Sequence, residues 1–204
     1  MQNYSKESGS GIQNKAIGKL ILASASPRRK ELLTQAGLEF ECIPSTIEEI
    51  ITKKNPKAVV RELAYTKALD VAGSFNDDAT IIGADTVVVF KGEIMGKPKD
   101  TDDAVRMLKK LQGKKQYVYT GVAILKKNKN IIKKKVFVSK TVVYMKPISN
   151  LWISEYVKSG EPMDKAGAYA IQGKADVQIK KIKGSYNNVV GLPIEKVLKV
   201  LGIK

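Results

Sequence analysis

The sequence contains no histidine, and it has one cysteine, one tryptophan and four phenylalanines in 204 residues. Without histidine, Ser-His-Asp and Cys-His catalysis, histidine general bases and the usual zinc and non-haem iron sites are excluded. A general base must therefore be a carboxylate, a lysine, a tyrosine or bound hydroxide. A metal ion would be a hard cation held by oxygen ligands, such as magnesium.

Long apolar runs are also missing. No run approaches the ~20 residues of a membrane span, and the N-terminus lacks the apolar core of a signal peptide. The single Cys42 cannot form an internal disulfide, which fits a reducing compartment. We therefore expect a cytoplasmic protein without a membrane partner. Residues 1–16 are polar and predict a disordered extension, whereas residues 17–204 predict a single globular domain with a full core.

The net charge of +16 indicates a polyanionic partner. Only four of the 36 basic residues are arginine, and runs of lysine such as residues 133–135 are typical of a solvated face. Two of the four arginines, Arg28 and Arg29, are adjacent, so the informative feature is their clustering.

These arginines follow an abrupt strand-to-helix transition. The apolar residues 20–23 lead to Ser24 and Ser26, and Pro27 then suits the first helical position. The free N–H groups of a first helical turn attract anions, and arginine suits bidentate phosphate contacts. The stretch predicts a phosphate-binding strand–turn–helix, or alternatively an ordinary helix start with solvated basic residues.

Two charged residues interrupt apolar patterns. Asp85 lies in residues 80–90, which otherwise read as a strand buried on both faces, and Gly83 leaves space on the same face. A carboxylate there is costly unless paired, so Asp85 either does chemistry or satisfies local backbone donors. Lys67 lies on the apolar stripe of a helix that begins at Pro56, so it either meets an anion inside or extends along the helix edge.

Helices alternate with strands in the first half of the sequence, and a long hairpin follows. This order predicts an α/β fold with a mixed, elongated, twisted sheet flanked by helices, forming two lobes around a central cleft. We expect Thr101 to cap a helix that ends at Leu111, and residues 184–188 to form a turn. The expected strands are residues 19–23, 40–43, 80–90, 117–125, 132–145 and 177–182, and the other helices are 27–36, 149–157 and 193–201.

Six stretches together resemble the signature blocks of the Maf family, in the family's order from about Lys19 to the C-terminus. The blocks begin at Ser24, Gly83, Gly96, Tyr119, Asp164 and Asn188. The resemblance implies a nucleoside triphosphate pyrophosphatase that uses Mg²⁺ or another divalent cation such as Mn²⁺, a fold related to the inosine triphosphatases, and a possible homodimer. The Gly-Ala-Asp-Thr and Tyr-x-Ile-Gln-Gly forms resemble the subgroup that acts on dTTP and UTP.

The resemblance also implies roles for individual residues. Asp85 would be the proton acceptor and, with Glu49, a metal ligand. Substrate binding would involve Ser24, Ser26, Arg28, Arg29, Lys67, Thr86, Lys97 and Gln172, of which Arg28, Thr86 and Gln172 match positions linked to substrate choice. Gln116 stands where many members have a histidine, so that imidazole cannot be essential here.

Two alternatives remain open. A house-cleaning enzyme would prefer modified purine nucleotides such as ITP or 7-methyl-GTP. A protein that acts in septum formation by binding nucleic acid or another protein would hydrolyse little nucleotide. The sequence has neither clusters of base-stacking aromatic residues nor a known reader motif, which argues against nucleic acid as a partner.

Overall fold

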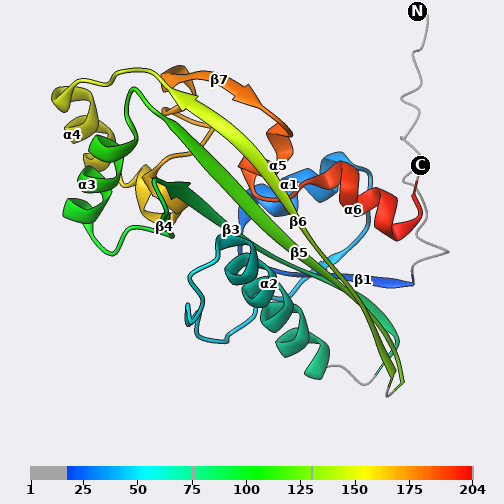
Figure 1. The fold of residues 1–204 in the computed structure, drawn as a ribbon. Coiled ribbons are helices and arrows are strands. Elements are labelled where there is room, and N and C mark those ends of the chain that lie inside the picture. Colours follow the sequence, from blue (N-terminus) through cyan, green and yellow to red (C-terminus); the bar gives the residue numbers. More distant parts are fainter. Residues whose placement is uncertain (1–17, 75–76, 130, 204) are drawn as a thin grey trace, which may run out of the picture.

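The computed structural model describes residues 18–74, 77–129 and 131–203, so the predicted extension over residues 1–16 lies outside the described residues. Figure 1 shows the arrangement of the elements. The strands are β1 (Lys19–Ala23), β2 (Glu41–Cys42), β3 (Ala79–Phe90), β4 (Glu93–Met95), β5 (Lys115–Asn128), β6 (Ile131–Met145) and β7 (Ile179–Lys183). The α-helices are α1 (Pro27–Gln35), α2 (Pro56–Gly73), α3 (Thr101–Leu111), α4 (Asn150–Lys158), α5 (Tyr186–Val190) and α6 (Ile194–Leu201), and the 3-10 turns are η1 (Glu161–Asp164), η2 (Ala166–Ala168) and η3 (Asp176–Gln178).

The described strands form one seven-stranded mixed sheet with the order β2-β1-β3-β5-β6-β7, in which β4 also pairs with β3. Strand β1 runs parallel to β2 and β3, and the remaining pairs are antiparallel. The β5–β6 hairpin crosses the whole molecule diagonally in Figure 1. The predicted mixed, elongated sheet flanked by helices is confirmed.

One edge of β3 is shared by two strands that do not meet. Strand β1 pairs with residues 79–83 and β4 pairs with residues 88–90, so in the described chain no strand covers residues 84–87 on that edge. Because β1 is parallel and β4 antiparallel to β3, their carboxyl ends face each other across this gap. The register separates them by five residue steps along β3, from Gly83 to Val88, or about 16 Å.

Alternation along the strands divides the core between the two faces of the sheet. Helix α2 covers one face with Ala64 and Ala68, against Ile81 of β3. Helices α1 and α6 cover the opposite face, where they pack against Ile82. A third cluster joins the far end of β3 to α3 and α4, so two lobes share the continuous strands β3, β5 and β6.

Several boundaries differ from the prediction. Asp100, not Thr101, caps α3, because its carboxylate accepts a hydrogen bond from the backbone of Asp103 at 2.7 Å. The expected turn at residues 184–188 is wrong, since Ser185 caps the short helix α5 by accepting from the backbone N–H of Asn188. The paired hairpin is also longer than residues 117–125 and 132–145, because its ladder continues through the lysine-rich tip.

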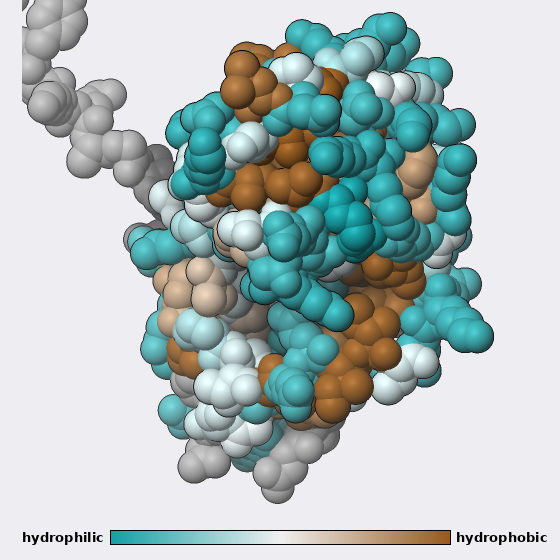
Figure 2. Space-filling view, turned by 90° about the vertical axis from the view of Figure 1, so that its left-hand side faces the viewer, coloured by the Kyte–Doolittle hydropathy of each residue, from teal (hydrophilic) through white to brown (hydrophobic). Residues whose placement is uncertain are grey.

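Hydrophilic side chains cover most of one face of the molecule (Figure 2). Figure 2 looks at the molecule from the left-hand side of Figure 1 and shows apolar groups in separate patches among hydrophilic side chains. Among the described residues, no helix combines the length and the apolar character that crossing a membrane requires.

Two glycines allow α2 to lie directly on the sheet. A Cβ atom at Gly121 of β5 would overlap the carbonyl oxygen of Val60, and one at Gly83 of β3 would overlap that of Ala64. The backbone of α2 therefore touches two adjacent strands, and this close approach holds Lys67 above β3.

Gly121→Ala is expected to lower the free energy of unfolding by about 1–3 kcal/mol, because the added methyl group must push α2 away from β5. Chemical denaturation followed by circular dichroism measures the change. Gly73→Ala is the matched control, since a Cβ atom at this last residue of α2 meets nothing within 4 Å and should leave stability equal or higher. Equal stability of Gly121→Ala and the wild type would contradict the close packing.

Candidate active site

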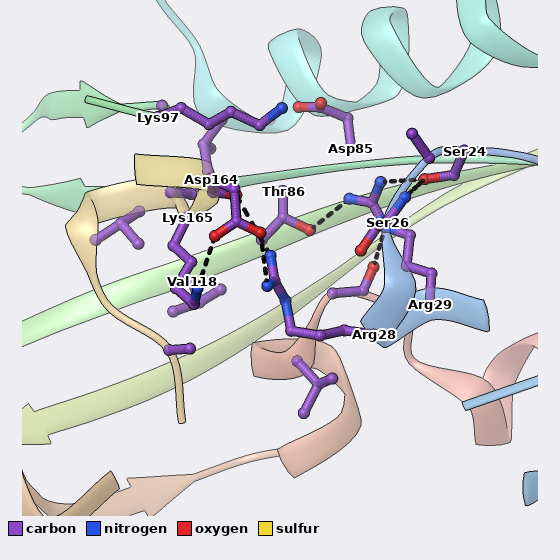
Figure 3. A pocket seen from close by; sticks show the side chains of 18 of the residues that line it. Ser24, Ser26, Arg28, Arg29, Asp85, Thr86, Lys97, Val118, Asp164 and Lys165 are labelled. Carbon is purple, nitrogen blue, oxygen red and sulfur yellow. Dashed lines mark hydrogen bonds and ion pairs between the residues drawn. The ribbon is translucent and has the colours of Figure 1, made fainter. Parts of the chain in front are cut away.

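A cavity of about 450 Å³ opens at the gap between the ends of β1 and β4. Figure 3 shows that its side chains come from both lobes. It brings together every candidate that the sequence predicted, which are Ser24, Ser26, Arg28, Arg29, Glu49, Lys67, Asp85, Thr86, Lys97 and Gln172.

On the α2 side of β3, one lysine joins two carboxylates. The Nζ atom of Lys67 lies 2.7 Å from Oδ1 of Asp85 and 2.8 Å from Oε1 of Glu49. The side chains of Lys67 and Asp85 are only 12% and 9% exposed, which excludes extension of Lys67 along the helix edge. Of the two sequence interpretations, the one in which Lys67 meets an anion is therefore confirmed, and in this structure the anions are the protein's own carboxylates.

Glu49 stays ionised because of its basic neighbours. Burial pushes the pKa of its carboxyl group upward, but the hydrogen bond and charge of Lys67 and the charges of Lys97 and Arg29 outweigh burial. The pKa of Glu49 therefore lies below its ordinary value of 4.5. In Figure 3 the amine of Lys97 points toward the carboxylate of Asp85, so this part of the cavity carries alternating charges.

On the opposite face, Arg29 is held entirely by the protein. Its guanidinium group donates to the carbonyl oxygen of Gly191 at 2.9 Å, to Oγ of Ser24 at 3.0 Å and to Oγ1 of Thr86 at 3.2 Å. Burial lowers the pKa of Arg29, and the charge of Asp85 partly offsets this effect. Arg29 thus ties α1 to β3 and fixes the floor of the cavity.

Arg28 reaches across the cleft instead. Its Nη1 atom lies 3.0 Å from Oδ2 of Asp164, whose Oδ1 atom also accepts from Nζ of Lys165 at 2.6 Å. Ser26 is the N-cap of α1 as predicted, but its side chain makes no capping hydrogen bond. The two adjacent arginines therefore differ, because Arg29 is bound by three protein acceptors whereas Arg28 pairs with a half-exposed carboxylate.

Sequence reasoning did not assign roles to Asp164, Lys165 or Ser45, although all three line the cavity. Asp164 and Lys165 lie in the same sequence block as Gln172, which was assigned a role. Nothing in the sequence pattern shows that Asp164 faces Arg28. Ser45 matters through Asp70, which accepts from Oγ of Ser45 at 2.7 Å and tethers the loop that carries Glu49.

The cavity has an apolar wall beside its charged one. Gln172, from the segment after η2, contributes an amide to a cavity whose apolar lining residues include Val118, Ala170, Ile171 and Val189. An amide both donates and accepts hydrogen bonds, so this wall suits a flat, polar-edged ring better than an anion.

The carboxylate pair matches the ligand chemistry of a hard divalent cation. Glu49 and Asp85 converge on one point of positive charge, and carboxylate oxygens are the ligands that Mg²⁺ prefers. Residues 18–74, 77–129 and 131–203 contain no group of three or more acidic, histidine or cysteine side chains arranged to hold a metal. An ion held by this pair would therefore take its remaining ligands from water or from a bound anion.

Acid is expected to destabilise the fold through these carboxylates. Glu49 and Asp164 have folded-state pKa values below their ordinary values of 4.5 and 3.8, so the unfolded chain binds protons more readily. Their contribution is complete above those values and is lost as the pH falls through the lower folded pKa values. Melting temperatures measured from pH 6 to pH 3 should fall, and Glu49→Gln should fall less steeply; equal slopes would contradict this assignment.

Comparison with known proteins places the chain in a family. The Maf-like protein family profile matches residues 19–203. A dTTP/UTP pyrophosphatase of Thermoanaerobacter sp. (strain X514) is 46% identical over 90% of this chain and 95% of its own length. A dTTP/UTP pyrophosphatase of Alkaliphilus oremlandii (strain OhILAs) is 49% identical over 89% of this chain and 94% of its own length.

Among solved structures, the Staphylococcus aureus Ham1 protein aligns with 14% identity over 90% of this chain and 98% of that one, with a TM-score of 0.48. The match to the family profile covers nearly the whole described chain, and the six sequence blocks fall within it. The chain belongs to the Maf family.

Proposed function

We propose that this protein hydrolyses dTTP and UTP to the nucleoside monophosphate and pyrophosphate. The observation that carries the proposal is the position of Asp85, a buried carboxylate at the uncovered stretch of β3, in a cavity lined by Arg28, Lys67 and Lys97. The names of relatives that are 46% and 49% identical support the same substrates.

The basic side chains would bind the triphosphate. Arg28 exchanges Asp164 for phosphate oxygens, because both are anions that suit its guanidinium group. Lys97 adds a point charge from the other lobe, and Arg29 keeps α1 and Thr86 in place while the substrate binds. Positive charge from Arg28 on one side of the gap between β1 and β4 and from Lys97 on the other suits a polyanionic ligand that spans the gap.

Asp85 acts as the general base. It accepts a proton from water, the water oxygen forms a bond to the α-phosphorus, and the bond from that phosphorus to the bridging oxygen breaks. Pyrophosphate leaves with the electron pair of the broken bond. Lys67 holds the Asp85 carboxylate in position through its 2.7 Å ion pair, so positioning and electrostatics supply most of the acceleration.

Glu49 and Asp85 would hold a divalent cation, Mg²⁺ or Mn²⁺, which neutralises charge on the phosphate oxygens when bound. Gln172 would face the nucleobase, since its amide matches the donor and acceptor edge of a pyrimidine and its neighbours in the cavity are apolar.

Pyrophosphate release should be measured with dTTP, UTP, CTP, ITP and 7-methyl-GTP, with and without magnesium. We expect the highest kcat/KM with dTTP and UTP and a requirement for the metal. A clear preference for ITP or 7-methyl-GTP would contradict the proposed substrates, and the absence of hydrolysis with every nucleotide would contradict the proposed reaction.

A further inference from the structure

Glu161 does not line the cavity, yet its side chain supports the segment that carries Gln172. Its Oε1 atom accepts hydrogen bonds from the backbone N–H of Lys174 at 3.1 Å and from the hydroxyl of Tyr156 at 3.2 Å. Its Oε2 atom lies 3.4 Å from the same backbone nitrogen. The carboxylate therefore connects the end of α4 to the residue two positions after Gln172.

Gly173, the residue between Gln172 and Lys174, also lies close to the Glu161 carboxylate. Gly173 has a φ of +97°, a conformation that favours glycine, and a Cβ atom there would lie 2.6 Å from Oε1 of Glu161. The carboxylate thus lies directly against the backbone that follows Gln172.

The other end of this connection is firmly packed. Tyr156 is buried, and its ring stacks on Trp152 with 4.7 Å between the centroids. Helix α4 packs with α3 in the core of this lobe. Glu161 therefore links the packed helix α4 to the segment that carries Gln172.

The backbone of Glu161 makes a separate contact with Lys165, one of the three charged residues Lys165, Asp164 and Arg28. Its carbonyl oxygen accepts from Nζ of Lys165, which pairs with Asp164, and Asp164 binds Arg28. A side-chain substitution at Glu161 leaves this carbonyl in place. An experiment can thus distinguish the two contacts, because the Glu161 carboxylate supports the Gln172 segment and the Glu161 carbonyl supports Lys165.

We propose that Glu161 is a positioning residue that sets base selectivity by fixing the Gln172 turn. This inference rests on the proposed function. Uracil and cytosine differ at the edge that an amide reads, so discrimination depends on where the backbone places the Gln172 amide relative to the ring. The Glu161 carboxylate holds the backbone directly after Gln172, and without it the amide can shift to suit either ring.

The test compares Glu161→Ala and Glu161→Gln with Glu155→Ala. Glu155 is the matched control, since it is an exposed α4 carboxylate paired with Lys158 outside the cavity. For Glu161→Ala we expect the ratio of kcat/KM for UTP to that for CTP to fall about tenfold through KM, while kcat for UTP changes less than about threefold. Glu161→Gln keeps one acceptor oxygen, so the ratio should fall only about threefold, and Glu155→Ala should match the wild type.

An unchanged ratio would overturn the inference, and so would an equal loss of kcat with all nucleotides, which a general structural role predicts. Folding is checked by the fluorescence of Trp152, the single tryptophan. If Glu161→Ala does not fold, Glu161→Gln decides by its own threefold criterion.

Equilibrium binding of α,β-imido analogues of UTP and CTP separates this inference from the proposed reaction. If the wild type binds the analogues without hydrolysing nucleotides, the reaction is wrong, and the tenfold criterion is applied to the ratio of the two Kd values. If the wild type hydrolyses UTP and the ratio does not change in the variants, only the inference is wrong. If neither analogue binds, both are overturned.

Discussion

Asp85→Asn is expected to lower kcat for dTTP by about 10²–10⁴-fold, the usual cost of removing a general base. Asparagine has nearly the same shape and can still accept the hydrogen bond from Lys67, so the cavity should keep its geometry. Because the basic residues are untouched, KM should change much less than kcat. Steady-state pyrophosphate release measures both parameters.

Asp103→Asn is the control for this experiment. Asp103 pairs with Arg106 on α3 and does not line the cavity, so its substitution removes a carboxylate without touching the proposed chemistry. Turnover close to that of the wild type is expected. If Asp85→Asn also kept near wild-type turnover, Asp85 would not be the base.

Lys67→Met is expected to lower the free energy of unfolding by about 3 kcal/mol and to abolish most activity. The substitution leaves Asp85 buried without its cation, and breaking a buried ion pair from one side costs this much. Glu49 is half exposed and can turn toward solvent, so the penalty arises mainly at Asp85. Urea denaturation at pH 7 measures the change.

A double-mutant cycle tests this cause. Adding Asp85→Asn to Lys67→Met removes the stranded charge, so the double variant should be more stable than Lys67→Met alone. Lys158→Met is the matched control, because its pair with Glu155 is exposed on both sides and its loss should change stability by less than about 0.5 kcal/mol. Simple additivity of the two site substitutions would show that Lys67 and Asp85 are not coupled.

The positions of individual site residues were predictable where one residue broke a local pattern. Asp85 stands out because a carboxylate interrupts an apolar strand, and Arg28 stands out because it follows a helix start. The strand pattern also determined which face Asp85 occupies, since Gly83 and Asp85 both face α2 in the structure. These predictions needed only periodicity and the cost of burying charge.

The partners of these residues were not predictable, because partners depend on packing between distant segments. Helical periodicity placed Lys67 on an inward face but could not show that Asp85 and Glu49 lie opposite it. The same limit applies to Arg28, whose partner Asp164 is 136 residues away in the sequence. The predicted cap of α3 was wrong because Asp100 and Thr101 are adjacent and both are good N-cap residues. Only the observed hydrogen bond distinguishes them.

The strands that pass through both lobes determine how the cleft can respond to a ligand. Since β3 and β5 each belong to the cores of both lobes, any change in the angle between the lobes has to bend these paired strands together. The distance between the ends of β1 and β4 is therefore set by the backbone of a single strand, over the five residue steps from Gly83 to Val88. The carboxylates of Asp164 and Glu49 are about half exposed, so the ion pairs of Arg28 and Lys67 with them can rearrange around a ligand more readily than these strands can bend.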